Sequence, residues 1–120
     1  MKSFLLVFLG GGLGSLLRYA ISLLPISTSS LFPYKTFFIN CIGSFFIGVL
    51  MYYFQALQSN TWKLLLATGF CGGFTTFSAF SFETLQLFQQ QQYLIAILYI
   101  LLSILLGIGC CVLGYFLFSF

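Results

Sequence analysis

The sequence has very little charge. Of its 120 residues, 4 are Lys or Arg, one is acidic and none is His, while 61% are hydrophobic. A soluble domain has about 25% charged residues, so a chain with 4% cannot cover a water-facing surface. A signal peptide would explain one apolar segment near the start, but apolar segments here continue to the last residue. We therefore expect an integral membrane protein.

Asp and His are absent, and Glu83 is the single acidic residue. One chain therefore has no carboxylate pair, no Ser-His-Asp triad and no His or carboxylate metal centre. We do not expect an enzyme. The cysteines lie in apolar segments without C-x-x-C spacing, which indicates small packed side chains rather than disulfides. They are Cys41, Cys71, Cys110 and Cys111.

Long polar linkers are also missing. Short polar turns separate apolar segments that each supply the roughly 20 residues needed to cross a bilayer. These segments cover residues 3–24, 33–57, 61–89 and 93–118. The expected fold is an all-α integral membrane bundle of four transmembrane helices. It forms a single domain over residues 1–120.

Glycines at a spacing of four mark the first segment. Gly10 and Gly14 form a Gly-x-x-x-Gly pair, which allows two helix backbones to approach closely in a membrane. A phosphate-binding loop would need a preceding strand and a following Gly-Lys-Ser/Thr, and neither is present. Helix packing is the favoured interpretation.

The second segment carries a polar stripe. Its small and polar residues recur every four positions and so lie on one helical face; they are Thr36, Asn40, Ser44 and Gly48. A buried amide in lipid needs partners. Asn40 therefore either holds helices together or contacts a permeating species, and local evidence leaves both open.

The third segment contains an unusual stretch, residues 69–83. Gly72-Gly73 followed by Thr75-Thr76 predicts a break in the helix. Unwound backbone at membrane depth survives only where it is buried in protein or lines a polar cavity, and its open carbonyls suit cations. Glu83 follows near the membrane edge, where we expect a solvated carboxylate.

The positive charges are balanced across the predicted bundle. Lys2 and Lys63 lie on one side, Arg18 and Lys35 on the other. The excess of Lys and Arg that normally orients a membrane protein is therefore absent. This favours insertion in both orientations and an antiparallel, dual-topology homodimer, equivalent to the inverted repeats of transporters. The alternative is a fixed orientation set by a weaker cue.

Three motifs together resemble the CrcB/Fluc fluoride channels. They are Gly11-Gly12-Leu13-Gly14-Ser15-Leu16-Leu17-Arg18-Tyr19, Asn40-Cys41-Ile42-Gly43-Ser44-Phe45-Phe46-Ile47-Gly48 and the stretch from Gly69 to Glu83. The resemblance covers essentially the whole chain. It implies a small antiparallel homodimer with two pores for F⁻, in the plasma membrane (the inner membrane of a bacterium). It also implies a structural Na⁺ at the centre of the dimer interface and a role in exporting toxic fluoride.

The resemblance also implies roles for individual residues. Backbone carbonyls of Gly72 and Gly73 correspond to the Na⁺ site, and Arg18 and Glu83 to vestibule charges. Ala79 departs from the family, which commonly has Thr or Ser there, so one hydroxyl of the polar track is missing. The fluoride path is expected to use Asn40, Thr76, Phe77, Ser78, Phe80, Tyr99 and Ser103.

These residue types suit a small, strongly hydrated anion. An amide and hydroxyls can donate hydrogen bonds in place of water. Phenylalanine has a positive ring edge, so Phe77 and Phe80 suit an anion that lies in the plane of the ring. A fixed cation at mid-membrane would hold the anion too tightly for conduction.

Two other functions remain as alternatives. A small multidrug-resistance-like dual-topology transporter needs a membrane carboxylate, normally in its first helix, whereas Glu83 lies late in the third segment. A structural subunit without transport would explain the glycines and the cysteines. It would not explain Asn40 together with Thr75-Thr76 and the pair Phe77 and Phe80.

Overall fold

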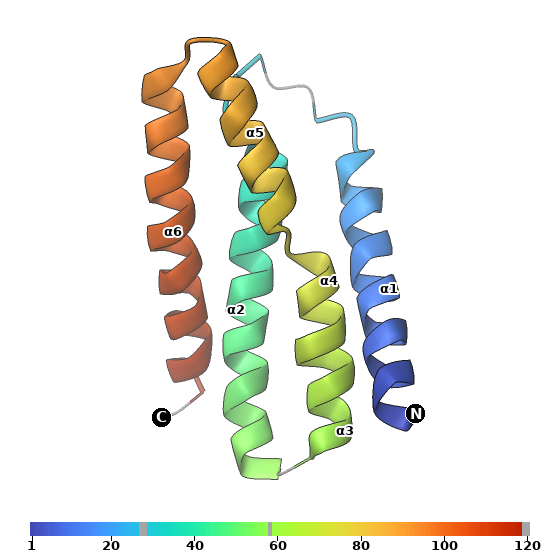
Figure 1. Cartoon of the computed structure of the whole chain (residues 1–120). Coiled ribbons are helices and arrows are strands. Elements are labelled where there is room, and N and C mark those ends of the chain that lie inside the picture. The colour runs from blue at the N-terminus through green and yellow to red at the C-terminus, as the bar shows by residue number, and fades with distance from the viewer. Residues whose placement is uncertain (27–28, 58, 119–120) are drawn as a thin grey trace.

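The computed structural model describes residues 1–26, 29–57 and 59–118. Every regular element in these ranges is a helix (Figure 1). In chain order the elements are α1 (Lys2–Ser22), α2 (Tyr34–Leu57), α3 (Asn60–Trp62), the π-helix η1 (Lys63–Cys71), α4 (Gly72–Phe74), α5 (Phe77–Gln89) and α6 (Tyr93–Phe116).

Four helical stretches of the described chain are long and apolar enough to span a membrane. The third stretch combines α3, η1, α4 and α5, and α1, α2 and α6 supply the others. The prediction of an all-helical fold with four spans is confirmed. Met1 and the end of α6 lie at the same end of the bundle (Figure 1).

Glycines set the closest contacts between helices. A Cβ at Gly14 of α1 would collide with the carbonyl oxygen of Phe70 in η1. A Cβ at Gly48 of α2 would collide with the carbonyl oxygen of Cys111 in α6. Small residues thus let α1 pack on η1 and α2 pack on α6 at backbone distance.

The third span is interrupted after α4. Thr75 (φ −76°, ψ 156°) and Thr76 (φ −149°, ψ 116°) are extended, and α5 begins at Phe77. The opening does not lie at Gly72-Gly73, where the sequence pattern predicts it. Gly72 is helical (φ −63°, ψ −37°) and both glycines belong to α4. The helix continues through them because Gly73 packs directly on the Gly11 backbone of α1.

Before the interruption, the span contains a π-helix that the sequence pattern did not predict. η1 covers nine residues, although π-helical geometry is rare and usually limited to a single turn. Within it, a Cβ on Gly69 would come 3.0 Å from the Gly10 Cα. The wider helix therefore still packs tightly on α1.

The buried core is small and lies where α2, α5 and α6 meet. Tyr99 and Ala96 have no exposed surface, and Phe37 and Leu87 pack around them. Many large apolar side chains outside this core are exposed, for example Phe4 and Leu105. Such a surface suits lipid or a second copy of the chain rather than water.

Candidate functional site

The extended residues form one wall of a cavity of about 350 Å³, here called the inner cavity. Its lining comes from α2, the end of η1 and start of α4, the interruption, α5 and α6. None of the described residues that line it is charged. Its polar side chains are Asn40, Ser44, Thr75, Thr76 and Ser103, and its rings are Phe77 and Phe80.

Asn40 binds the backbone of the interruption. Its Nδ2 donates to the Thr76 carbonyl oxygen at 3.1 Å, and its Oδ1 accepts from the Thr76 N–H at 2.8 Å. Of the two roles left open by the sequence, the bond between spans is therefore present. It uses one of the two amide hydrogens, and the side chain still lines the inner cavity.

Thr76 organises the start of α5. Its Oγ1 accepts from the Ala79 N–H at 3.2 Å and lies 3.2 Å from the Ser78 hydroxyl. This is an N-cap, which satisfies one of the free N–H groups of a helix start. The cap directs α5 away from the interruption.

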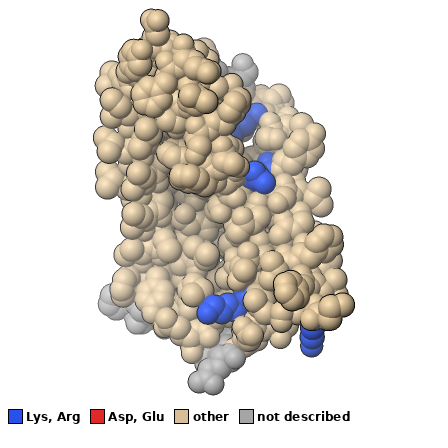
Figure 2. Space-filling view, viewed as in Figure 1, with Lys and Arg blue, Asp and Glu red and all other residues tan. Residues whose placement is uncertain are grey.

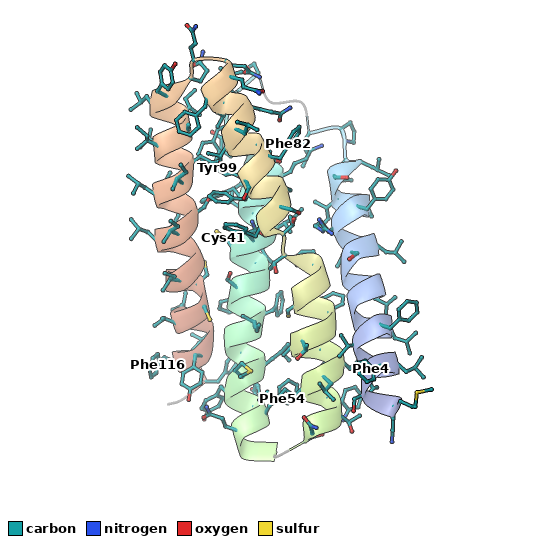
Figure 3. All side chains as sticks on the ribbon, viewed as in Figure 1. Phe4, Cys41, Phe54, Phe82, Tyr99 and Phe116 are labelled. Atoms are coloured by element: carbon teal, nitrogen blue, oxygen red, sulfur yellow. The ribbon has the colours of Figure 1, made fainter. Side chains whose placement is uncertain are left out.

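Three aromatic rings form a row in space from α5 to α6. The centroids of Phe77 and Phe80 are 5.6 Å apart, and those of Phe80 and Tyr99 are 5.1 Å apart. Phe77 is 79% exposed in the single chain, whereas Tyr99 is fully buried. Figure 3 shows Tyr99 between α6 and α5.

Ser103 of α6 has a free hydroxyl. Its Oγ is buried and has no hydrogen-bond partner in the described part of the chain, yet the residue lines the inner cavity. A buried hydroxyl without a partner costs about 1–3 kcal/mol. The hydroxyl is therefore an open donor for a small ligand in the cavity.

A second cavity, of about 330 Å³, lies between α1, α2 and the start of α5. It is called the charged hollow, because Arg18, Lys35 and Glu83 line it. Thr76 lines both cavities. The residue bound by Asn40 therefore separates the inner cavity from the charged hollow.

Glu83 is held in place by hydroxyls. Thr36 Oγ1 donates to its Oε1 at 2.6 Å, and the Tyr99 hydroxyl donates to its Oε2 at 2.7 Å. The residue is half-buried and lines the charged hollow, so its expected place as a vestibule charge stays a prediction. Charged hydrogen bonds of this kind are short and strong.

The structure brings most of the expected site residues together. Asn40, Thr76, Phe77, Phe80, Ser103 and Gly72 share the inner cavity, and Arg18 and Glu83 share the charged hollow. Ser78 joins through Thr76, and Tyr99 through Phe80 and Glu83. Gly73 of α4 lies apart from the inner cavity and faces α1, where its carbonyl oxygen accepts from the Ser15 hydroxyl at 3.3 Å.

Sequence reasoning missed two contributors. Lys35 lines the charged hollow, and Thr36 binds Glu83. Thr36 was recognisable as a member of the polar stripe that also contains Asn40. The pairing of Thr36 with Glu83 was not, because the two are 47 positions apart in the chain.

The sequence matches a known protein family. Residues 5–115 match the profile of the family described as CrcB-like protein, Camphor Resistance (CrcB). The chain belongs to the CrcB family. The resemblance in the three motifs is thereby confirmed, and the CrcB chain with its four apolar spans is a multi-pass membrane protein.

Curated relatives of this CrcB chain include several proteins named as fluoride channels. A protein of Azobacteroides pseudotrichonymphae genomovar. CFP2, named Fluoride-specific ion channel FluC, is 44% identical over 126 residues, covering 100% of this chain and 98% of the relative. The FluC protein of Oceanobacillus iheyensis is 48% identical, covering 95% and 89%. That of Pyrococcus abyssi is 42% identical, covering 98% and 96%.

Proposed function

We propose that the chain is a fluoride-selective channel that exports F⁻ across the membrane and so lowers fluoride toxicity. The observation that carries the proposal is the inner cavity, which offers uncharged donors and ring edges at an interrupted helix. The names of the relatives support fluoride as the ion and a channel rather than an enzyme.

The lining matches what a dehydrated anion needs. Moving a bare ion of this size into a low-dielectric interior costs on the order of 20 kcal/mol in the idealised Born picture. The free hydroxyl of Ser103 and the second amide hydrogen of Asn40 can replace lost water. Phe77 and Phe80 add positive ring edges. With no fixed cation in the lining, the ion can also leave.

The proposed path uses both cavities. Fluoride collects in the charged hollow beside Arg18, passes Thr76 and Ser78, and reaches the inner cavity. The Tyr99 ring lies against Phe80, and the Tyr99 hydroxyl donates to Glu83. Tyr99 therefore fixes the position of the Phe80 ring relative to the Glu83 carboxylate. The ion passes between the two cavities at Thr76, because Thr76 lines both the charged hollow and the inner cavity.

The functional unit in this proposal is an antiparallel homodimer with two pores. The balanced positive charges permit both orientations. Phe77 is 79% exposed although it lines the inner cavity, so a second copy would complete the wall beside its ring. Four helices per chain are also few to enclose a pore.

A structural Na⁺ at the dimer centre is part of the proposal. The Thr76 N–H, which would close a helical turn onto Gly72, donates to Asn40 instead, so the Gly72 carbonyl lacks its helical partner. Gly72 is exposed and has open space around it. Gly73 keeps one acceptor site beside its bond from Ser15. The donor set therefore fits a hard cation, which would hold two subunits together.

The multidrug-transporter alternative is not favoured. Its mechanism requires a carboxylate free to exchange protons with cationic substrates. Here both oxygens of Glu83 accept hydrogen bonds from hydroxyls of the same chain. The carboxylate also lies in the third span rather than the first.

A liposome efflux assay with a fluoride electrode tests the proposal. The purified protein should release F⁻ rapidly while Cl⁻ stays inside. No F⁻ release from well-reconstituted protein, or equal release of F⁻ and Cl⁻, would overturn the channel assignment.

A further inference from the structure

Lys35 forms a tie between the first two spans. Its Nζ donates to the carbonyl oxygens of Ser22 and Leu24, both at 2.8 Å. α1 ends at Ser22, and the last carbonyls of a helix have no intrahelical partner. A cation is also favourable at this end of the helix dipole. Lys35, the second residue of α2, thus caps α1.

This tie matters because α1 has few other contacts with α2. Along most of its length α1 packs on η1 and α4 instead. Arg18 lies one turn before Ser22, at the same end of α1. Without Lys35, the end of α1 that carries Arg18 would have no polar link to α2 among the described contacts.

Lys35 and Arg18 face the same space. Both line the charged hollow, with Glu83 as the one acidic residue there. Glu83 is engaged by Thr36 and Tyr99, and the buried Nε of Arg18 has no hydrogen-bond partner in the described part of the chain. The lining therefore carries two positive charges and one negative charge.

The surface reflects this balance. Figure 2 shows Lys and Arg side chains beside a hollow between α5 and α1, and no Asp or Glu on the face in view. Cations that line a hollow with low-dielectric walls raise the local concentration of anions and the rate at which they enter. Salt weakens this effect, because the Debye length falls from about 30 Å at 0.01 M to about 3 Å at 1 M.

We propose that Lys35 is a positioning residue of the anion entrance, which caps α1 so that Arg18 stays at the charged hollow and adds a second positive charge there. The inference rests on the proposed fluoride conduction. It concerns how F⁻ reaches the pore, and not how the pore selects it.

Flux at two ionic strengths tests the charge. Lys35→Met should lower the initial F⁻ efflux several-fold at about 0.01 M and much less at about 1 M of a salt with a large organic anion. Lys35→Arg should retain most of the flux. Lys63→Met is the matched control, because Lys63 is exposed and lines neither cavity.

The position of Arg18 gives a readout that does not depend on flux. Arg18 is the only arginine in the chain, so the phenylglyoxal adduct on the Arg18 peptide, measured by proteolysis and mass spectrometry, reports on its accessibility. In Lys35→Met the adduct should form faster than in the wild type or in Lys63→Met. An unchanged rate would overturn the positioning role.

The flux outcomes separate the two proposals. Wild-type protein without F⁻ flux overturns the proposed function, and this inference with it. Normal wild-type flux with Lys35→Met unaffected at both ionic strengths overturns the inference alone. If Lys35→Met loses the same fraction of F⁻ efflux at both ionic strengths and has a lower heat-denaturation midpoint, Lys35 only stabilises the fold. That result would overturn the charge role.

Discussion

Asn40 holds Thr76 by both backbone groups, donating to its carbonyl oxygen at 3.1 Å and accepting from its N–H at 2.8 Å. The side chain thereby replaces the helical partners that Thr76 lacks. The interruption in the third span is thus stabilised from α2, and its position beside the inner cavity follows from this pair.

Removal of the Asn40 amide should destabilise the interruption. Asn40→Ala deletes two hydrogen bonds and leaves buried backbone groups of Thr76 unpaired, at a cost of about 2–4 kcal/mol. Loss of monodisperse protein on size-exclusion chromatography after heating measures the effect. Asn60→Ala is the control, because Asn60 is exposed at the start of α3. Equal heat stability of the two variants would contradict the pairing.

Packing of α1 on η1 predicts opposite effects at two glycines of one helix. Gly14→Ala places a Cβ against the Phe70 carbonyl oxygen, and overpacking of this kind costs about 1–3 kcal/mol. Gly12 has nothing within 4 Å of a new Cβ, so Gly12→Ala should be neutral or gain up to about 1 kcal/mol of helix propensity. Heat-denaturation midpoints in detergent compare the two. A Gly14→Ala midpoint at or above that of Gly12→Ala would refute the close contact.

The ring of Phe80 should be needed for conduction. Phe80→Ile keeps apolar bulk but removes the positive ring edge, and we expect at least about a tenfold loss of F⁻ efflux, or 1.4 kcal/mol at the barrier. Phe82→Ile is the matched control, since Phe82 is 60% exposed and lies two residues further along α5. If both variants conduct like the wild type, Phe80 is not on the path.

The balanced charges predict both orientations in one membrane. A tag placed before Met1 can be detected with a membrane-impermeant label added from one side of the membrane. About half of the protein should be labelled from each side. Asn60→Lys with Thr61→Lys adds positive charge to one side and should bias insertion to a single orientation. Wild-type protein labelled from one side only would exclude the antiparallel dimer.

Much of the fold follows from composition. Apolar length alone predicts four spans, because lipid forces the backbone of each to bond within itself. The expected bounds 33–57 and 93–118 agree with α2 and α6 to within two residues. The Gly-x-x-x-Gly spacing at Gly10 and Gly14 likewise predicts a close helix contact, although it does not identify η1 as the partner.

The location of the interruption could not be predicted in the same way. Adjacent glycines pointed to Gly72-Gly73 because glycine is the weakest helix former short of proline. In the structure the Gly11 backbone lies directly against Gly73, so Gly73 serves packing, whereas a Cβ on Gly72 would meet nothing within 4 Å. The helix opens instead at Thr75 and Thr76, where Asn40 and the Thr76 cap supply alternative partners.

By itself, the sequence determined that this is a membrane protein of four helical spans, since so few charges and such long apolar runs allow no water-facing fold. It also determined which residue types were available for an anion, because amide, hydroxyl and ring donors are properties of single residues. Only the tertiary structure decided which of them meet. Thr36 with Glu83, and Lys35 with the end of α1, are joined by packing between different spans, and no local pattern records a contact between distant segments.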